Sequence, residues 1–153
     1  MWEIIDYHQE HFHEMLEMTI ENYGVSNHIS DKDFIEYEYF SNPEGNAFIK
    51  LAYDREQQRL AGQYIVIPRR FFVDGRLMAS VLSLNTLTRA EYRGQQVFTR
   101  LAEAVYEECR KQNKYFCYGA PNQNSFHGFI KKLAFDNIGK VPLNLKILKM
   151  TCH

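Results

Sequence analysis

The chain lacks several features that would assign it to particular classes of protein. It has only three cysteines, Cys109, Cys117 and Cys152, and no two of them have the spacing of a metal site or a redox motif. No apolar run is long enough to cross a bilayer, and no signal-peptide pattern follows Met1. We therefore expect a cytoplasmic protein in a reducing compartment, with no membrane partner.

An excess of charge of either sign is also missing. The chain has 18 Lys and Arg against 19 Asp and Glu, a net charge of -1, which argues against a nucleic-acid partner. His8, His11 and His13 cluster near the N-terminus, but no Cys or carboxylate lies at ligand spacing from them, so we predict no metal site. The Gly-x-Ser-x-Gly turn, the Walker loop and the glycine triad of nucleotide-binding folds are absent.

What is present indicates an ordinary globular chain. A length of 153 residues predicts a single domain over residues 1–153, and a 45% share of hydrophobic residues can form a sizeable core. The 10 Tyr and 11 Phe favour an aromatic core over an aromatic-lined binding cleft.

Hydrophobic periodicity predicts an α/β (α+β) arrangement in which antiparallel hairpins come first. Apolar residues recur at helical spacing from Phe12 to Tyr23 and end at Gly24, and Asp74-Gly75 between β-rich runs predicts a hairpin. The predicted elements, in order, are a strand over 3–6, helices over 12–23 and 31–40, strands over 47–53, 60–68, 71–73 and 76–87, a helix over 97–113, a strand over 115–120, a helix over 126–133, and strands over 135–141 and 143–150.

One β-α-β crossover follows these hairpins. The strands that end near Leu87 and Ala120 flank a helix, so we expect them to be parallel neighbours in one sheet. The turn after Leu87 then lies at the carboxyl end of a strand, where ligands of open α/β sheets bind.

The start of that crossover helix has the character of an anion site. No carboxylate occurs in the helix before Glu103, although natural helices favour Asp or Glu in the first turn. Arg93 and Arg100 flank the turn instead, where the helix dipole would repel them unless an anion were bound. The alternative is an ordinary helix entry with polar surface residues.

Three segments then resemble the GNAT superfamily of acyl-CoA-dependent N-acetyltransferases. Thr88-Arg-Ala-Glu-Tyr-Arg-Gly is similar to the lead-in to the family's pyrophosphate loop, Tyr118-Gly-Ala-Pro-Asn to the end of its fifth strand, and Lys131-Lys-Leu-Ala-Phe to a helix end. The resemblance covers nearly the whole chain and includes a bacterial subgroup of uncharacterised acetyltransferases. It implies a GNAT-like mixed, mostly antiparallel twisted sheet with a central β-α-β crossover and about four helices.

The resemblance also implies acetyl-CoA as the acyl donor, with no metal. A backbone N–H near Leu84 or Asn85 would bind the thioester carbonyl. Two positions depart from the family's loop: Gln96 and Phe98 stand where glycine or a small residue is usual, and a positive φ at Gln96 would cost about 1–2 kcal/mol. The implied cofactor-binding residues are Leu84, Asn85, Thr86, Leu87, Arg93, Gly94, Gln95, Gln96, Val97, Phe98, Thr99, Asn122 and Ser125.

The implied reaction is direct attack of a small acceptor's amine on acetyl-CoA in a ternary complex. The family's usual acid, a tyrosine, is replaced by Ile130, and its frequent glutamate base is replaced by Ser80, Ser83 and Asn85. We expect the acceptor pocket to form at residues 24–30 and 42–46, and a homodimer is possible. The substitute catalytic candidates are Ser125, Tyr118 and His127.

Two alternatives stay open at this point. Asn122 and Ser125 have an equally good interpretation as caps of the helix after Pro121. The missing acid and base also allow a catalytically weak or inactive GNAT-like domain that binds acyl-CoA or acts as an interaction module.

Overall fold

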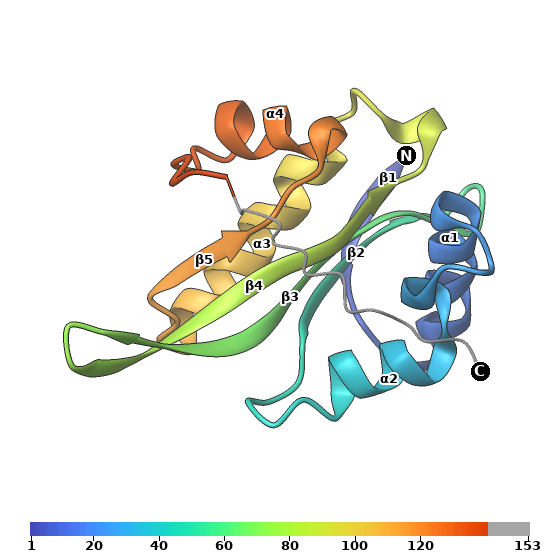
Figure 1. Cartoon of the computed structure of the whole chain (residues 1–153). Coiled ribbons are helices and arrows are strands. Elements are labelled where there is room, and N and C mark those ends of the chain that lie inside the picture. The colour runs from blue at the N-terminus through green and yellow to red at the C-terminus, as the bar shows by residue number, and fades with distance from the viewer. Residues whose placement is uncertain (141–153) are drawn as a thin grey trace, which may run out of the picture.

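The computed structural model describes residues 1–140, which form five strands and four α-helices (Figure 1). Short 3-10 turns, η1 (Gln9–His11), η2 (His28–Ser30) and η3 (Ala90–Tyr92), join some of them. The longer elements are β1 (Trp2–Asp6), α1 (Phe12–Tyr23), α2 (Lys32–Phe40), β2 (Phe48–Asp54), β3 (Arg59–Val73), β4 (Arg76–Thr88), α3 (Val97–Lys111), β5 (Phe116–Gly119) and α4 (Gln123–Lys132).

The strands form one sheet in the order β1-β2-β3-β4-β5. The first three pairings are antiparallel, and only β4 and β5 run parallel, joined by α3. Side chains of α1 and α2 pack on one face of the sheet, and side chains of α3 pack on the other. The predicted mixed sheet with one β-α-β crossover is thereby confirmed.

Local signals placed the helix ends correctly. Asp31 caps α2 by accepting a hydrogen bond from the Phe34 N–H at 2.8 Å, and Gly24 ends α1 with a φ of 86°. Both follow from simple chemistry, because a short carboxylate satisfies a free N–H and glycine tolerates positive φ.

Two strand predictions were wrong. Residues 60–68 and 71–73 belong to one 15-residue strand, β3, which continues through Pro68 and the two arginines after it. The strand predicted over 135–141 is absent from its described part: Phe135 packs its ring on Phe129 and Tyr106, and residues 136–140 are exposed. The strand predicted over 143–150, like Val141, lies outside the described residues.

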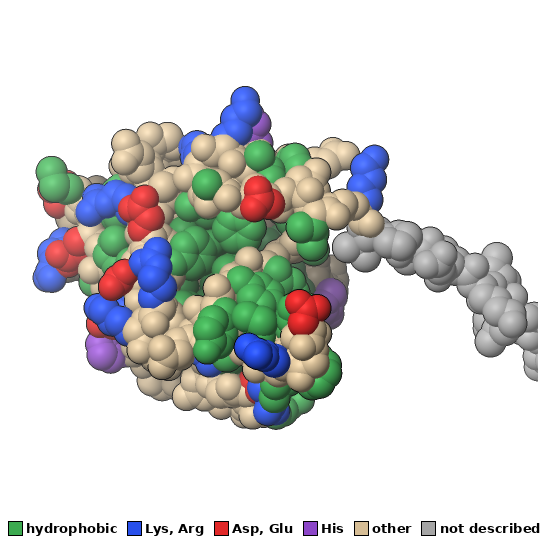
Figure 2. All heavy atoms as spheres, turned by 90° about the vertical axis from the view of Figure 1, so that its left-hand side faces the viewer, with side chains coloured by type: hydrophobic (Ala, Val, Ile, Leu, Met, Phe, Trp, Pro, Cys, Tyr) green, Lys and Arg blue, Asp and Glu red, His purple; other side chains and the backbone are tan. Residues whose placement is uncertain are grey.

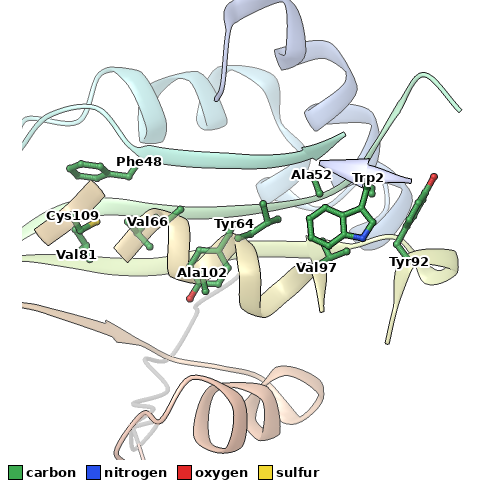
Figure 3. Packing of buried hydrophobic residues seen from close by; sticks show 13 residues of the cluster. Trp2, Phe48, Ala52, Tyr64, Val66, Val81, Tyr92, Val97, Ala102 and Cys109 are labelled. Atoms are coloured by element: carbon green, nitrogen blue, oxygen red, sulfur yellow. The ribbon is translucent and has the colours of Figure 1, made fainter. Parts of the chain in front are cut away.

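The core on the α3 face positions the start of that helix. Trp2, Val97 and Tyr92 lie together at one end of the layer between α3 and the sheet (Figure 3). Gly62 of β3 lies beneath Val97, and a Cβ added there would be 2.9 Å from Val97 Cγ1 and 2.8 Å from the Leu87 carbonyl oxygen. The absence of a side chain at Gly62 therefore lets the end of β4 and the start of α3 approach the sheet closely.

Two kinds of feature are absent from the part of the chain that the structure describes. No helix there is both long and apolar enough to span a bilayer. Over the same residues, 1–140, no three His, Cys, Asp or Glu side chains are grouped so that they could hold a metal ion.

Candidate functional site

A cavity opens where β4 and β5 separate. Their pairing runs from Ser80–Phe116 to Ser83–Gly119 and then ends, so no strand within residues 1–140 pairs with this edge of β4 from Leu84 onward. The cavity has a volume of about 350 Å³ and contains polar and apolar groups. Its lining is Tyr23, Leu82, Ser83, Leu84, Asn85, Thr86, Ala120, Pro121, Asn122, Ser125 and Phe129.

A β-bulge shapes the β4 wall of this cavity. Ile65 pairs with Leu84 but Gln63 pairs with Leu87, so Asn85 and Thr86 together oppose the single residue Tyr64. Asn85 has a φ of 47°, in the left-handed region that asparagine tolerates better than most residues. The bulge bends β4 where β5 leaves it, and this opens the cavity.

The opposite wall is the start of α4. The Asn122 side-chain oxygen accepts hydrogen bonds from the N–H groups of Asn124 and Ser125, both at 3.0 Å. Ser125 Oγ donates back to the same oxygen at 3.1 Å. Asn122 and Ser125 therefore cap the helix as the alternative interpretation predicted, and both also line the cavity.

The loop between β4 and α3 lies at the same end of β4. It turns through Gly94, with a φ of 80°, and Gln96, with a φ of 62°, before α3 begins at Val97. No side chain caps α3 and its first turn has no acidic residue, so the helix start is suited to an anion. Because a glutamine with positive φ is strained by about 1–2 kcal/mol, the chain adopts a glycine-like loop conformation at an energetic cost.

A buried carboxylate anchors this loop to β2. Asp54 Oδ2 accepts a hydrogen bond from the Tyr92 hydroxyl at 3.1 Å, and Oδ1 accepts from the N–H groups of Glu56 and Gln57 at 3.0 and 3.3 Å. Burial alone would raise the pKa of Asp54, but the bonds from Gln57, Tyr92 and Glu56 lower it below its usual 3.8. The ionised carboxylate therefore holds η3, just before the loop, in place.

We expect this carboxylate to make stability depend on pH below about 4. Because the pKa of Asp54 is lower in the folded state, its stabilisation is complete above the unfolded pKa and is lost as the pH falls through the folded pKa. Urea unfolding between about pH 2 and pH 6 should show that Asp54→Asn is less stable than wild type at the higher pH and that the difference shrinks with acid. A difference that is constant across that range would contradict the assignment.

An aromatic contact joins α3 to α4 above the cavity. The Phe98 ring lies 5.5 Å from the Phe129 ring and 5.7 Å from the Tyr64 ring, centroid to centroid. Gly128 allows this approach, because a Cβ there would be 3.2 Å from Phe98 Cε1. Phe98, which departs from the expected loop pattern, is thus a packing residue that fixes α4 relative to the loop.

Of the three catalytic candidates, the structure brings only Ser125 to the cavity. The alternation of β5 turns Tyr118 to the sheet face where its ring packs 4.8 Å from Phe71. His127 is exposed on α4 and is not part of the cavity lining. The catalytic expectation for Tyr118 and His127 therefore has no support from their placement.

Tyr118 instead lines a second, largely apolar groove of about 720 Å³ beside β5. Figure 2 shows hydrophobic side chains gathered in a hollow on this side of the molecule. Phe71, Phe116 and Tyr118 meet edge to face or tilted there. The groove is separate from the cavity between the strands. Among the described residues, none lines both of them.

The loops expected to form an acceptor pocket are not in the cavity lining. Asn42 caps its own turn by accepting a hydrogen bond from the Glu44 N–H, and Glu44 pairs with Arg70 of β3 at 2.5 Å. Tyr23, the last residue of α1, lines the cavity from this side instead. Its contribution was missed because it ends an apolar helix stripe and so has the pattern of a core residue.

A buried chain of hydroxyl groups runs inward from the cavity. Ser83 Oγ donates to the Tyr64 hydroxyl at 3.1 Å, and the Tyr64 and Tyr106 hydroxyls lie 2.5 Å apart. Burial raises the pKa of both tyrosines, so both remain neutral at physiological pH. The sequence gives no signal for this row of hydroxyl groups, because the three residues come from three separate elements.

The two described cysteines are poor nucleophiles in this setting. Burial raises the pKa of Cys109 to about 12 and that of Cys117 to about 11, so both are thiols at pH 7. This agrees with the interpretation of both as small hydrophobic residues of the core.

The splayed parallel strands, the β4 bulge and the open helix start coincide with a family match. A family model described as an acetyltransferase (GNAT) domain matches residues 3–130. The chain therefore belongs to the GNAT acetyltransferases. No match to a curated protein is found.

Solved structures share the fold at low sequence identity. An acetyltransferase from Trypanosoma brucei is 16% identical, with 96% of this chain and 100% of that one covered and a TM-score of 0.73. An aminoglycoside antibiotic 6'-N-acetyltransferase from Acinetobacter baumannii is 14% identical, with 97% and 100% covered and a TM-score of 0.71. A predicted acetyltransferase with acetyl-CoA from Clostridium acetobutylicum is 13% identical, with 94% and 96% covered and a TM-score of 0.75.

Proposed function

We propose that the protein is an N-acetyltransferase that moves an acetyl group from acetyl-CoA to the amine of a small acceptor. The observation that carries this proposal is the cavity between β4 and β5, which lies at the same end of β4 as the uncapped start of α3. A ligand with an anionic pyrophosphate and a long neutral arm matches these two features together. The similar structure from Clostridium acetobutylicum was determined with acetyl-CoA.

In this proposal the loop binds the pyrophosphate and the cavity takes the pantetheine arm. Backbone N–H groups of Gly94 to Thr99, with the Arg93 guanidinium, face the phosphates. The edge of β4 from Leu84 to Leu87 lies along the arm, and Asn122 and Ser125 lie across from it. The strain at Gln96 makes us expect weaker binding than a glycine would give.

The proposed reaction is direct transfer. The acceptor amine attacks the thioester carbonyl, and a backbone N–H at Leu84 or Asn85 stabilises the negative charge that develops on the carbonyl oxygen. Most of the rate comes from holding the two reactants together. As the C–S bond breaks, the attacking nitrogen loses its extra proton to water. The leaving thiolate takes a proton from Ser125 Oγ, directly or through water, and water returns a proton to Ser125.

The acceptor is proposed to be small, such as an amino sugar. One supporting similarity is to the Acinetobacter baumannii enzyme, which acts on an aminoglycoside. The nearly neutral net charge agrees with a small acceptor that is not strongly charged. We also propose that residues 1–153 form one domain and that the protein is cytoplasmic. A homodimer is its proposed assembly.

A second function is favoured by two specific observations. Gln96 adopts a left-handed backbone conformation that suits glycine and strains a glutamine. Ile130 replaces the tyrosine that usually serves as the acid. These features suit a domain that binds acyl-CoA weakly or not at all and acts through interactions.

A thermal-shift titration with acetyl-CoA separates the two proposals. Ligand at about a hundred times its Kd should stabilise the folded state by about 2.7 kcal/mol, a shift of several degrees. Free CoA and desulfo-CoA serve as controls for the contribution of the acyl group and the sulfur. No shift at millimolar acetyl-CoA would remove the transferase proposal in favour of the interaction module.

Arg93→Glu is expected to reduce that ligand-induced shift by about half or more at the same acetyl-CoA concentration. Arg93 is exposed, so its replacement should change the stability of the free protein by less than about 0.5 kcal/mol. With acetyl-CoA present, the new carboxylate would repel the pyrophosphate, and we expect Kd to rise roughly tenfold or more.

The matched control for Arg93→Glu is Arg76→Glu, the same charge reversal at the exposed β3–β4 hairpin far along β4 from the loop. It should keep the wild-type shift. Equal loss of the shift in both variants would mean that net charge, not the loop, governs binding.

A further inference from the structure

We propose that Gln63 and Tyr39 are positioning residues that hold the β4 bulge, so that its backbone N–H faces the carbonyl of the bound acetyl group. This inference rests on the proposed function, because it assigns a task to the bulge in that reaction. Neither residue lines the cavity, so neither would touch the substrate. Both would act through Asn85.

Gln63 holds the bulge from the adjacent strand. It lies in the middle of β3 with no exposed surface, and its Nε2 donates a hydrogen bond to the Asn85 carbonyl oxygen at 2.9 Å. Its neighbours Ala61, Tyr64 and Ile65 are also completely buried. A buried amide is unfavourable unless it is hydrogen-bonded. Among the described residues, the Gln63 side chain makes its only hydrogen bond to the bulge.

Tyr39 holds the bulge from the helix layer. It is 1% exposed on α2, and its hydroxyl accepts a hydrogen bond from Asn85 Nδ2 at 2.7 Å. Burial raises the pKa of Tyr39, so the hydroxyl remains neutral and available as an acceptor. The backbone carbonyl and the side chain of Asn85 are thus fixed from two different elements.

The need for two such bonds follows from the backbone at Asn85. Its φ of 47° is unfavourable for a residue with a side chain, and a regular strand would relax it. Relaxation would restore the pairing register that β3 and β4 keep from Ile65 to Val73, which differs by one residue from the register at Gln63. A shift of one residue would turn the N–H groups and side chains of β4 at the bulge to the opposite side of the strand.

Unpartnered polar atoms beside the bulge support a role beyond packing. Gln63 Oε1 and Thr86 Oγ1 are buried and have no hydrogen-bond partner among the described residues. Thr86 itself lines the cavity. An apolar side chain at Gln63 would fill the same space without an unpartnered oxygen, so the amide is best explained by its bond to Asn85.

The inference is tested with Gln63→Met and Tyr39→Phe, which keep the side-chain size and remove the hydrogen bond. The probe is acetyl-CoA labelled with carbon-13 at the acetyl carbonyl, and the measurement is the infrared difference spectrum of the carbonyl stretch on binding. A carbonyl that accepts a hydrogen bond absorbs at lower frequency. Wild type should therefore lower the stretch, and each variant should lose at least half of that change while Kd rises less than roughly threefold.

Tyr7→Phe is the matched control, since it removes a tyrosine hydroxyl whose partner is Gln9 of η1 and not the bulge. It should keep the wild-type spectrum. Asn85→Gly is a further variant, for use if Tyr39→Phe does not fold. Glycine tolerates the positive φ but lacks the side-chain amide, so this variant should also lose part of the lowering of the carbonyl stretch.

The outcomes separate this inference from the function on which it rests. If wild type does not bind acetyl-CoA, the proposed function fails and the inference fails with it. If wild type binds acetyl-CoA and lowers the carbonyl stretch but the variants keep that change, the inference alone is overturned. If wild type binds acetyl-CoA with an unchanged stretch, the inference and the proposed role of the backbone N–H fail together, while acetyl-CoA binding stands.

Discussion

Ala120→Trp is expected to weaken acetyl-CoA binding by about a hundredfold or more, which corresponds to about 2.8 kcal/mol. Ala120 follows β5 directly and lines the cavity opposite the β4 bulge. The volume available between the strands is about 350 Å³, and an indole side chain would occupy much of the space proposed for the pantetheine arm. Isothermal titration of the variant and of wild type with acetyl-CoA measures the effect.

The same substitution should leave the free protein folded. Ala120 is exposed, so the tryptophan does not have to enter the core, and we expect the free energy of unfolding to change by less than about 0.5 kcal/mol. Ala120→Ser, which adds one small atom, should bind acetyl-CoA like wild type. Unimpaired binding by Ala120→Trp would place the ligand outside this cavity and would contradict the proposed site.

Gly62→Ala is expected to lower the free energy of unfolding by about 2–3 kcal/mol, although it adds a single methyl group. The new Cβ would be 2.8 Å from the Leu87 carbonyl oxygen and 2.9 Å from Val97 Cγ1. Both neighbours are fixed, because one is backbone and Val97 is a buried residue at the start of α3. Thermal unfolding should show a decrease in Tm of about 5–10 °C.

Gly128→Ala provides the comparison for Gly62→Ala. Its new Cβ would be 3.2 Å from the Phe98 ring, which can shift, and alanine also favours the helical backbone of α4. We expect its stability to stay within about 1 kcal/mol of wild type. Equal destabilisation by the two variants would show that backbone flexibility, not the close approach at Gly62, governs the effect.

Gly62→Ala should also affect ligand binding. Because Gly62 seats the end of β4 and the start of α3, the displacement of Leu87 or Val97 would move the proposed pyrophosphate loop. The loop would then lose affinity for acetyl-CoA even where the variant is still folded.

Much of the fold was predictable because its signals are local. Periodic apolar residues defined α1, and Asp31, Gly24 and the Asp74-Gly75 turn marked ends and a hairpin through their own backbone preferences. The strand predicted over 135–141 is absent from residues 135–140 for the converse reason. An apolar Phe135 satisfies a strand pattern and a tertiary contact equally well, and here the contact with Phe129 prevailed.

The site was predictable only in outline. The order of elements and the acid-free helix start indicated the loop at residues 93–99, because both depend on chain order and on helix ends. The position of the cavity near Leu84 and Asn122 came from the resemblance to the family. Whether Tyr118 faced the cavity depended on the register of β5. Its partner, Phe71, is distant in sequence and gives no local signal.

The sequence by itself indicated the family through its resemblance and the parallel crossover through the order of its elements. It indicated the place of the anion-suited loop through the residue types at one helix start. Only the tertiary structure decided the positive φ of Gln96, the bulge at Asn85 and the burial of Gln63 and Tyr39 beside it. The bulge and the burial of these two side chains depend on how β3, β4 and α2 meet. A backbone conformation that is locally unfavourable persists where hydrogen bonds from other elements outweigh its strain.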